Sequence, residues 1–94
     1  MGMVSATITV VVKVKAASKL FRAFIDGRRI LFKDGSARLG FVPDGGEHVL
    51  MWFIRDKPGT SYVIEVTEPS KIKMTHKAAL DASAMDAGIY WFKL

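Results

Sequence analysis

The segment FIDGRRILFKDGSARL, residues 24–39, contains two Asp-Gly pairs, Asp26-Gly27 and Asp34-Gly35, each between apolar residues. An Asp-Gly pair in this setting is typical of a two-residue hairpin turn, because Asp and Gly both tolerate the positive φ angles that such a turn requires. Two hairpins in succession predict a meander of three antiparallel strands over residues 20–42. Turns of this kind also fix the register of the strands that they join.

The predicted register places Ile25 opposite Arg28 across the first turn and Phe32 opposite Ala37 across the second. Side chains then alternate between the two faces of the meander. The face expected to line the core carries Phe21, Ala23, Ile25, Ile30, Phe32, Ala37, Leu39 and Phe41. The opposite face carries the candidate binding residues, which are Arg22, Phe24, Arg29, Leu31, Lys33 and Arg38.

Strands are also predicted on both sides of the meander. Residues 7–15 alternate between valine or isoleucine and polar side chains, which is typical of a half-buried strand, and a short connection is expected at residues 16–18. Residues 47–55 are almost continuously apolar, which favours a central strand covered on both faces. Residues 62–67 and 71–76 alternate again.

The last part of the chain divides into two segments of different composition. Residues 77–88 are rich in alanine, which favours a short helical turn or a loop over a strand. Residues 89–94 are aromatic and apolar and are expected to form a terminal strand that packs against other parts of the chain.

About seven short strands with turn residues between them predict a single all-β domain over residues 1–94. Residues 1–3 are expected to be an added or disordered start. We expect a small immunoglobulin-like antiparallel β-sandwich, because residues 47–55 are more easily covered on both sides there. A small OB-like or SH3-like barrel is the alternative.

Composition narrows the function only in part. The formal net charge of +5 favours acidic partners, and the absence of cysteine excludes disulfides and a thiol nucleophile without indicating a compartment. No apolar stretch approaches the ~20 residues of a bilayer span, so no transmembrane segment is expected and the domain should be soluble.

The pattern of turns resembles a known family. Ile25-Asp26-Gly27 matches a strand that ends in an IDG turn, and residues 43–50, PDGGEHVL, match a proline-glycine turn that opens a strand. Over about half of the chain, this resembles the β-sandwich repeats of bacterial surface proteins of the PEGA and carboxypeptidase-regulatory type. The resemblance implies an immunoglobulin-like sandwich with an adhesive or structural role and without catalytic residues.

Motifs for chemistry are missing from the sequence. His48 and His76 are the only histidines, and they lie in different predicted strands without the spacing of metal ligands. No serine lies in a nucleophile elbow, and no phosphate-binding or dinucleotide-binding loop is present. We therefore expect no enzyme activity, no metal and no cofactor.

The sequence favours a non-enzymatic binding or assembly module. The candidate binding residues and the C-terminal strand would contact a protein partner or a second copy of the chain. The four cations beside Phe24 leave single-stranded nucleic acid as an alternative. Glycan binding is a third hypothesis, with Trp52, Tyr90 and Trp91 as stacking platforms, although Trp52 and Phe53 are expected to belong to the core.

Overall fold

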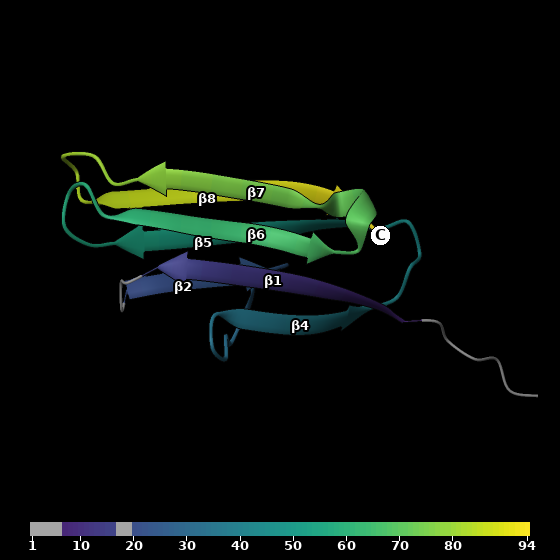
Figure 1. The fold of residues 1–94 in the computed structure, drawn as a ribbon. Helices are drawn as coiled ribbons and strands as arrows, with labels where there is room; N and C mark the ends of the chain where they lie inside the picture. Colours follow the sequence, from purple (N-terminus) through teal and green to yellow (C-terminus); the bar gives the residue numbers. More distant parts are fainter. Residues whose placement is uncertain (1–6, 17–19) are drawn as a thin grey trace, which may run out of the picture.

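The computed structural model describes residues 7–16 and 20–94. The start expected at residues 1–3 and most of the connection expected at residues 16–18 lie outside the described residues. Eight strands occur in the described part, and they form two antiparallel sheets of four strands that pack face to face (Figure 1). The elements are β1 (Ile8–Ala16), β2 (Leu20–Ile25), β3 (Arg28–Arg29), β4 (Ser36–Phe41), β5 (Glu47–Arg55), β6 (Ser61–Glu68), the 3-10 helix η1 (Ser70–Ile72), β7 (Met74–Ala79) and β8 (Met85–Lys93).

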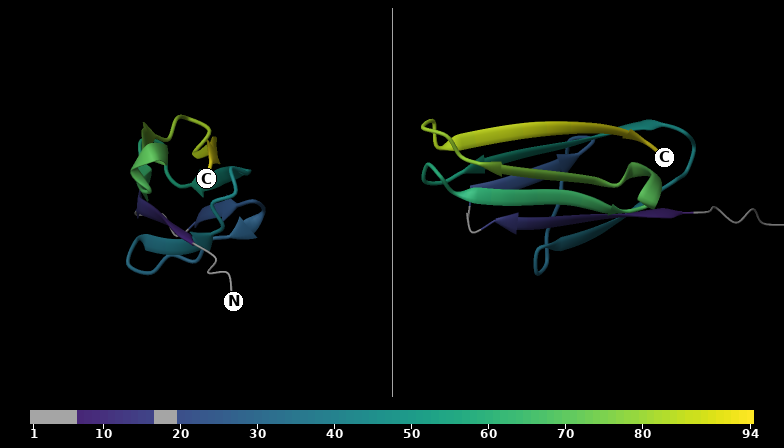
Figure 2. Two further views of the ribbon diagram at one scale, coloured as in Figure 1. Left: turned by 90° about the vertical axis from the view of Figure 1, so that its right-hand side faces the viewer. Right: turned by 45° about the horizontal axis from the view of Figure 1, so that its top comes forward.

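The two sheets take strands from both halves of the chain. Sheet A has the order β4-β1-β6-β7, and sheet B has the order β3-β2-β5-β8. Figure 2 shows the two layers end-on and from the side. The predicted all-β antiparallel sandwich is confirmed, with eight strands where about seven were expected, and the described strands form two separate sheets that do not join into a barrel. Within residues 7–16 and 20–94, no helix is both long and apolar enough to cross a membrane.

Both predicted Asp-Gly hairpin turns are present. Ile25 pairs with Arg28 across the first turn, and Asp26 and Gly27 have φ angles of 52° and 79°. A single bridge closes the second turn at residues 33 and 36. The local turn chemistry was therefore sufficient to place both turns.

The prediction that these turns join one three-stranded sheet is wrong. Ala37 does not lie opposite Phe32 but pairs with Val12, because β4 leaves sheet B and joins β1 in sheet A. The second turn docks on β1, where the Val14 amide donates to the Gly35 carbonyl at 2.8 Å. A Cβ on Gly35 would lie 2.8 Å from the Val14 carbonyl oxygen, so only glycine permits this approach.

The predicted set of core residues is nevertheless confirmed. Four of them are buried between the sheets, namely Ala23, Ile25, Ile30 and Ala37. The other four, Phe21, Phe32, Leu39 and Phe41, are partly buried and pack against the same core. Alternation along a strand decides which side chains point inward, whichever sheet the strand joins. The predicted core residues therefore point inward although β4 pairs with β1.

The prediction of a helical turn or loop over residues 77–88 is also wrong. β7 continues to Ala79 and β8 begins at Met85, which leaves only residues 80–84 as a connection. Small residues occur here because the packing is close. A Cβ on Gly88 would lie 2.0 Å from Cζ2 of the Trp52 indole, which covers this position.

A buried hydrogen-bond chain connects the two sheets. Trp52 Nε1 on β5 donates to the Tyr62 hydroxyl on β6 at 3.1 Å, and that hydroxyl donates to Asp86 Oδ2 on β8 at 2.6 Å. Burial and the hydrogen bond to the Asp86 carboxylate raise the pKa of Tyr62 to about 12. The His76 ring, which points inward from β7, lies 5.2 Å from the Trp52 ring. These contacts fix β8 relative to sheet A.

Candidate interaction surface

The outward face of sheet B is apolar. In the strand register, Phe24, Met51 and Ile89 lie side by side in one row, and Val49 and Trp91 lie in the next. Trp91 is 60% exposed, Ile89 52% and Phe53 45%. We call this surface the apolar face, and it consists of Leu20, Phe24, Val49, Met51, Phe53, Met85, Ala87, Ile89 and Trp91.

The outward face of sheet A has a different composition. One row across β1, β6 and β7 consists of Lys13, Glu65 and Thr75, and the next row has Lys15 and Lys77 on either side of a partly buried Val63. An antiparallel sheet with one solvated side normally shows this polar composition on that side. Sheet B departs from that pattern, so its outward face requires another explanation.

The area of the apolar face is large for so small a domain. Five of its side chains, Leu20, Phe53, Met85, Ile89 and Trp91, are each about half exposed. At ~200 Å² for a side chain of this size, they present roughly 500 Å² of apolar surface. This is near the upper end of the ~300–600 Å² of the largest patch on an ordinary monomer, and such patches are often functional.

β8 contributes most of the exposed apolar surface, through Met85, Ile89 and Trp91, and the long apolar run in β5 adds Phe53. β5 is a central strand, as predicted, with Leu50, Trp52 and Ile54 buried on its inner side. Its outer side is not fully covered, so the predicted burial of both faces, and with it the core assignment of Phe53, is wrong. The continuous hydrophobic run therefore marks a strand with one side in the core and the other side only partly covered.

The structure divides the predicted binding surface. Arg22, Phe24 and Arg29 lie together on the outward face of sheet B, where Phe24 contacts Phe53 with ring centroids 6.3 Å apart. Arg38 lies on β4 in sheet A, opposite Val11. The predicted single face is therefore wrong, because β4 belongs to the other sheet.

The two remaining candidates, Leu31 and Lys33, lie in the connection between β3 and β4. Leu31 is 78% exposed and belongs to the segment that crosses from β3 toward the second hairpin turn. Lys33 closes that turn by bridging to Ser36. Neither residue belongs to the outward surface of sheet B, and the sequence pattern alone did not separate them from Phe24.

Cations surround the apolar face. Arg22 lies beside Phe53, Arg29 beside Phe24, and Arg55 between Leu20 and Met85, and all three cations are exposed. A fourth cation, Lys93, lies opposite Glu47 in the strand register. The surface therefore combines an apolar centre with a mainly basic rim.

A groove at one end of the apolar face has a volume of about 420 Å³. Its lining includes Leu20, Phe53, Met85 and Ala87, and the β7–β8 connection contributes Ser83. A groove of this size is large enough for one bulky side chain of a partner, because drug-sized ligand sites occupy ~300–1,000 Å³.

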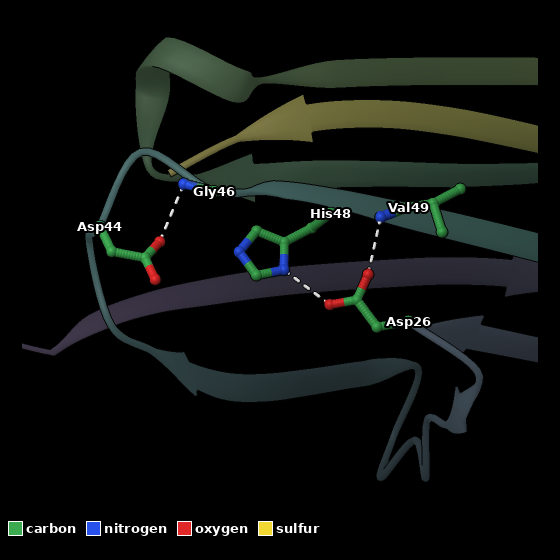
Figure 3. A network of polar contacts seen from close by, with 5 residues as sticks. All are labelled: Asp26, Asp44, Gly46, His48 and Val49. Atoms are coloured by element: carbon green, nitrogen blue, oxygen red, sulfur yellow. Dashed lines mark hydrogen bonds and ion pairs between the residues drawn. The ribbon is translucent and has the colours of Figure 1, made fainter.

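A carboxylate-imidazole pair lies beside the first hairpin turn, as Figure 3 shows. His48 Nδ1 lies 2.6 Å from Asp26 Oδ2, and the Val49 amide donates to Asp26 Oδ1 at 3.0 Å. Burial would raise the pKa of Asp26, but the hydrogen bonds from His48 and Val49 and the nearby charge of Arg28 lower it below its ordinary value. The pair holds the first hairpin turn against β5.

This pair has no group to activate among the described residues. The His48 ring lies between Phe41, at 4.8 Å, and Phe92, at 5.6 Å, and its Nε2 is buried without a hydrogen-bond partner. In the same part of the chain, no three His, Asp or Glu side chains lie close enough to share a metal ion. The geometry supports a structural role for Asp26 and His48.

The aromatic residues considered for glycan stacking do not form one platform. Trp52 is only 3% exposed and belongs to the core. Tyr90 points inward and its hydroxyl donates to the Ile72 carbonyl at 2.9 Å. Only Trp91 presents its ring to solvent, and it does so as part of the apolar face.

Comparison with known proteins gives no relative: no family model matches the chain, and neither do curated proteins or solved structures. The resemblance to the PEGA and carboxypeptidase-regulatory type, and the immunoglobulin-like subclass that it implies, remain predictions.

Proposed function

We propose that this domain is a non-enzymatic protein-binding module and that the apolar face with its basic rim is the contact surface. One observation carries the proposal: Phe53, Ile89 and Trp91 lie exposed on adjoining strands of one sheet, while the other sheet has a polar exterior. Aromatic residues, methionine and arginine are the types enriched at protein interfaces, and all of them occur here.

The composition of the face favours protein over the alternatives. A polyanion would contact Arg22 and Arg29, but Leu20, Met85 and Ile89 would gain nothing from phosphates or bases at their side of the sheet. A sugar needs hydrogen-bonding groups beside the aromatic ring, whereas Trp91 lies opposite Val49. An apolar partner surface with acidic groups at its margin complements the entire face.

Affinity capture with two charge-matched variants tests this proposal. Phe53→Glu places a carboxylate in the middle of the apolar face, and Thr75→Glu places the same charge on the exposed surface of sheet A. Partners that wild type retains should be retained by Thr75→Glu and lost by Phe53→Glu, because interface aromatics are worth ~2 kcal/mol or more. Circular dichroism establishes that both variants fold.

Equal retention by all three baits would refute the proposal. A titration with labelled single-stranded oligonucleotides accompanies the capture, since nucleic-acid binding through this face would be salt-dependent and reduced by the Phe53→Glu change. We expect no such binding at physiological salt.

A further inference from the structure

The open edge of sheet B is a second feature that could engage another chain. β8 pairs with β5 in one unbroken register of nine residues, Met85–Lys93, and within the described residues no strand pairs with its other side. Figure 2 shows β8, in yellow, at the margin of the molecule. Natural edge strands are usually protected by proline, bulges, central lysines or shortness. β8 has no proline, and its two charged residues, Asp86 and Lys93, lie near its two ends.

The sequence of β8 is complementary to itself in the antiparallel direction. If Ile89 lies opposite Ile89 of a second copy, Ala87 lies opposite Trp91 on the outward face, and Gly88 lies opposite Tyr90 on the inward face. The Trp91 indole then faces a small residue, Ala87, on the outward face, while Gly88 is already covered by the Trp52 indole of its own chain.

Charge also favours this edge over the apolar face as the site for a second copy. In the centred register Asp86 lies opposite Phe92 and Lys93 lies opposite Met85, so no like charges meet. Packing two apolar faces against each other would instead bring together arginines of both chains, in proteins with a net charge of +5.

We propose that β8 pairs antiparallel with β8 of a second copy, centred on Ile89, and joins two B sheets into one sheet of eight strands. This goes beyond the protein-binding function, because it uses the backbone edge of the sheet and places two apolar faces side by side. Contact through one strand is at the small end of specific interfaces, below ~1,200 Å², so the dimer should depend on protein concentration.

Cysteine crosslinking tests the register directly, because the native chain contains no cysteine. Ile89→Cys should form a disulfide-linked dimer on mild oxidation, since residues directly opposite have Cβ atoms ~4.5–5.5 Å apart. Lys13→Cys, at an exposed position on the inner strand β1, is the control and should remain monomeric. A short bismaleimide reagent serves as a second crosslinker that is less sensitive to thiol geometry.

A mixing experiment distinguishes this register from others. Ala87→Cys and Trp91→Cys should each crosslink slowly alone, because identical positions would lie about 13 Å apart, four residues along the strand. Mixed together, they should form a heterodimer at least tenfold faster. A mixture that reacts no faster than either protein alone, or a Lys13→Cys control that reacts as fast as Ile89→Cys, would overturn the proposal.

Sedimentation of the native chain completes the test. A strict monomer at millimolar concentration would likewise overturn β8 pairing and leave this edge to a different chain. Phe53 is on β5, so the two proposals fail separately: retention of protein partners by Phe53→Glu refutes the protein-binding face, whereas absence of Ile89→Cys crosslinking refutes β8 pairing.

Discussion

Replacing Gly88 with alanine should destabilise this sandwich, although the same change elsewhere in a strand usually stabilises it slightly. The backbone at Gly88 is not in the left-handed region, so alanine would meet no strain there. What opposes the extra methyl group is the Trp52 indole, which covers Gly88 from the neighbouring strand. The prediction therefore isolates one packing contact.

The magnitude follows from the distances. A Cβ at position 88 would lie 2.0 Å from Cζ2 and 2.3 Å from Cε2 of Trp52, whereas carbon atoms pack at ~3.5–4.0 Å. The indole would have to move by more than ~1 Å, yet it is buried and its Nε1 donates to the Tyr62 hydroxyl at 3.1 Å. Overpacking at ~1–3 kcal/mol and a weakened hydrogen bond at ~1 kcal/mol give a loss of about 2–4 kcal/mol.

Urea denaturation followed by tryptophan fluorescence measures this loss. Gly40→Ala is the matched control, because its Cβ would lie 3.7 Å from the Thr7 methyl group, an ordinary contact, and its stability should stay within ~0.5 kcal/mol of wild type. Adding Trp52→Phe to Gly88→Ala should recover part of the loss relative to Trp52→Phe alone. Equal stability of Gly88→Ala and Gly40→Ala would refute the packing argument.

Three further predictions concern stability. The raised pKa of Tyr62 favours the neutral phenol in the folded state, so the stabilising contribution of Tyr62 should be fully present below pH 10 and should decline as pH rises toward about 12. Tyr62→Phe should flatten this decline in alkaline denaturation curves. The lowered pKa of Asp26 acts in the opposite direction: the stabilising contribution of Asp26 is present above pH 3.8 and is lost as pH falls further. The free energy of unfolding of Asp26→Asn, measured across an acid titration, should lack this loss. Gly35→Ala combines a φ of 75° with a contact of 2.8 Å to the Val14 carbonyl, so thermal denaturation should show a loss of at least ~1–2 kcal/mol, whereas an unchanged melting temperature would contradict the docking of this turn on β1.

Local signals in the sequence predicted the turns and the inward side chains. Asp26-Gly27 and Asp34-Gly35 form their turns through the conformations of two residues each, so no distant information was needed. Alternation likewise placed Ala23, Ile30 and Leu39 toward the core.

The sheet that each strand joins depends on distant residues and could not be predicted from these signals. β4 follows a hairpin turn, yet the open edge of β1 and the close approach of Gly35 to Val14 draw it into sheet A. For the same reason the predicted binding surface is divided in the structure: Arg38 belongs to β4 and therefore lies on sheet A, on the other side of the molecule.

Composition misled in two segments where tertiary packing decides the residue type. Gly88 and Ala78 are small because a large neighbour or the core lies against them, and alanine-rich composition was interpreted as helix propensity. The apolar run of residues 49–54 was interpreted as burial on both sides, whereas its outer side is only partly covered and Phe53 is exposed together with Ile89 and Trp91 of β8. A run of this kind beside an exposed aromatic strand could have indicated an interface.

Photocrosslinking from the apolar face is the most direct test of the central claim, that the outward side of sheet B contacts another protein. A photoreactive phenylalanine analogue replaces Phe53 in one protein and Thr75, on the exterior of sheet A, in another. After irradiation in the cells that make the chain, position 53 should yield discrete adducts with a specific protein and position 75 should yield none. Adducts of the same identity and yield from both positions, or none from position 53, would contradict it.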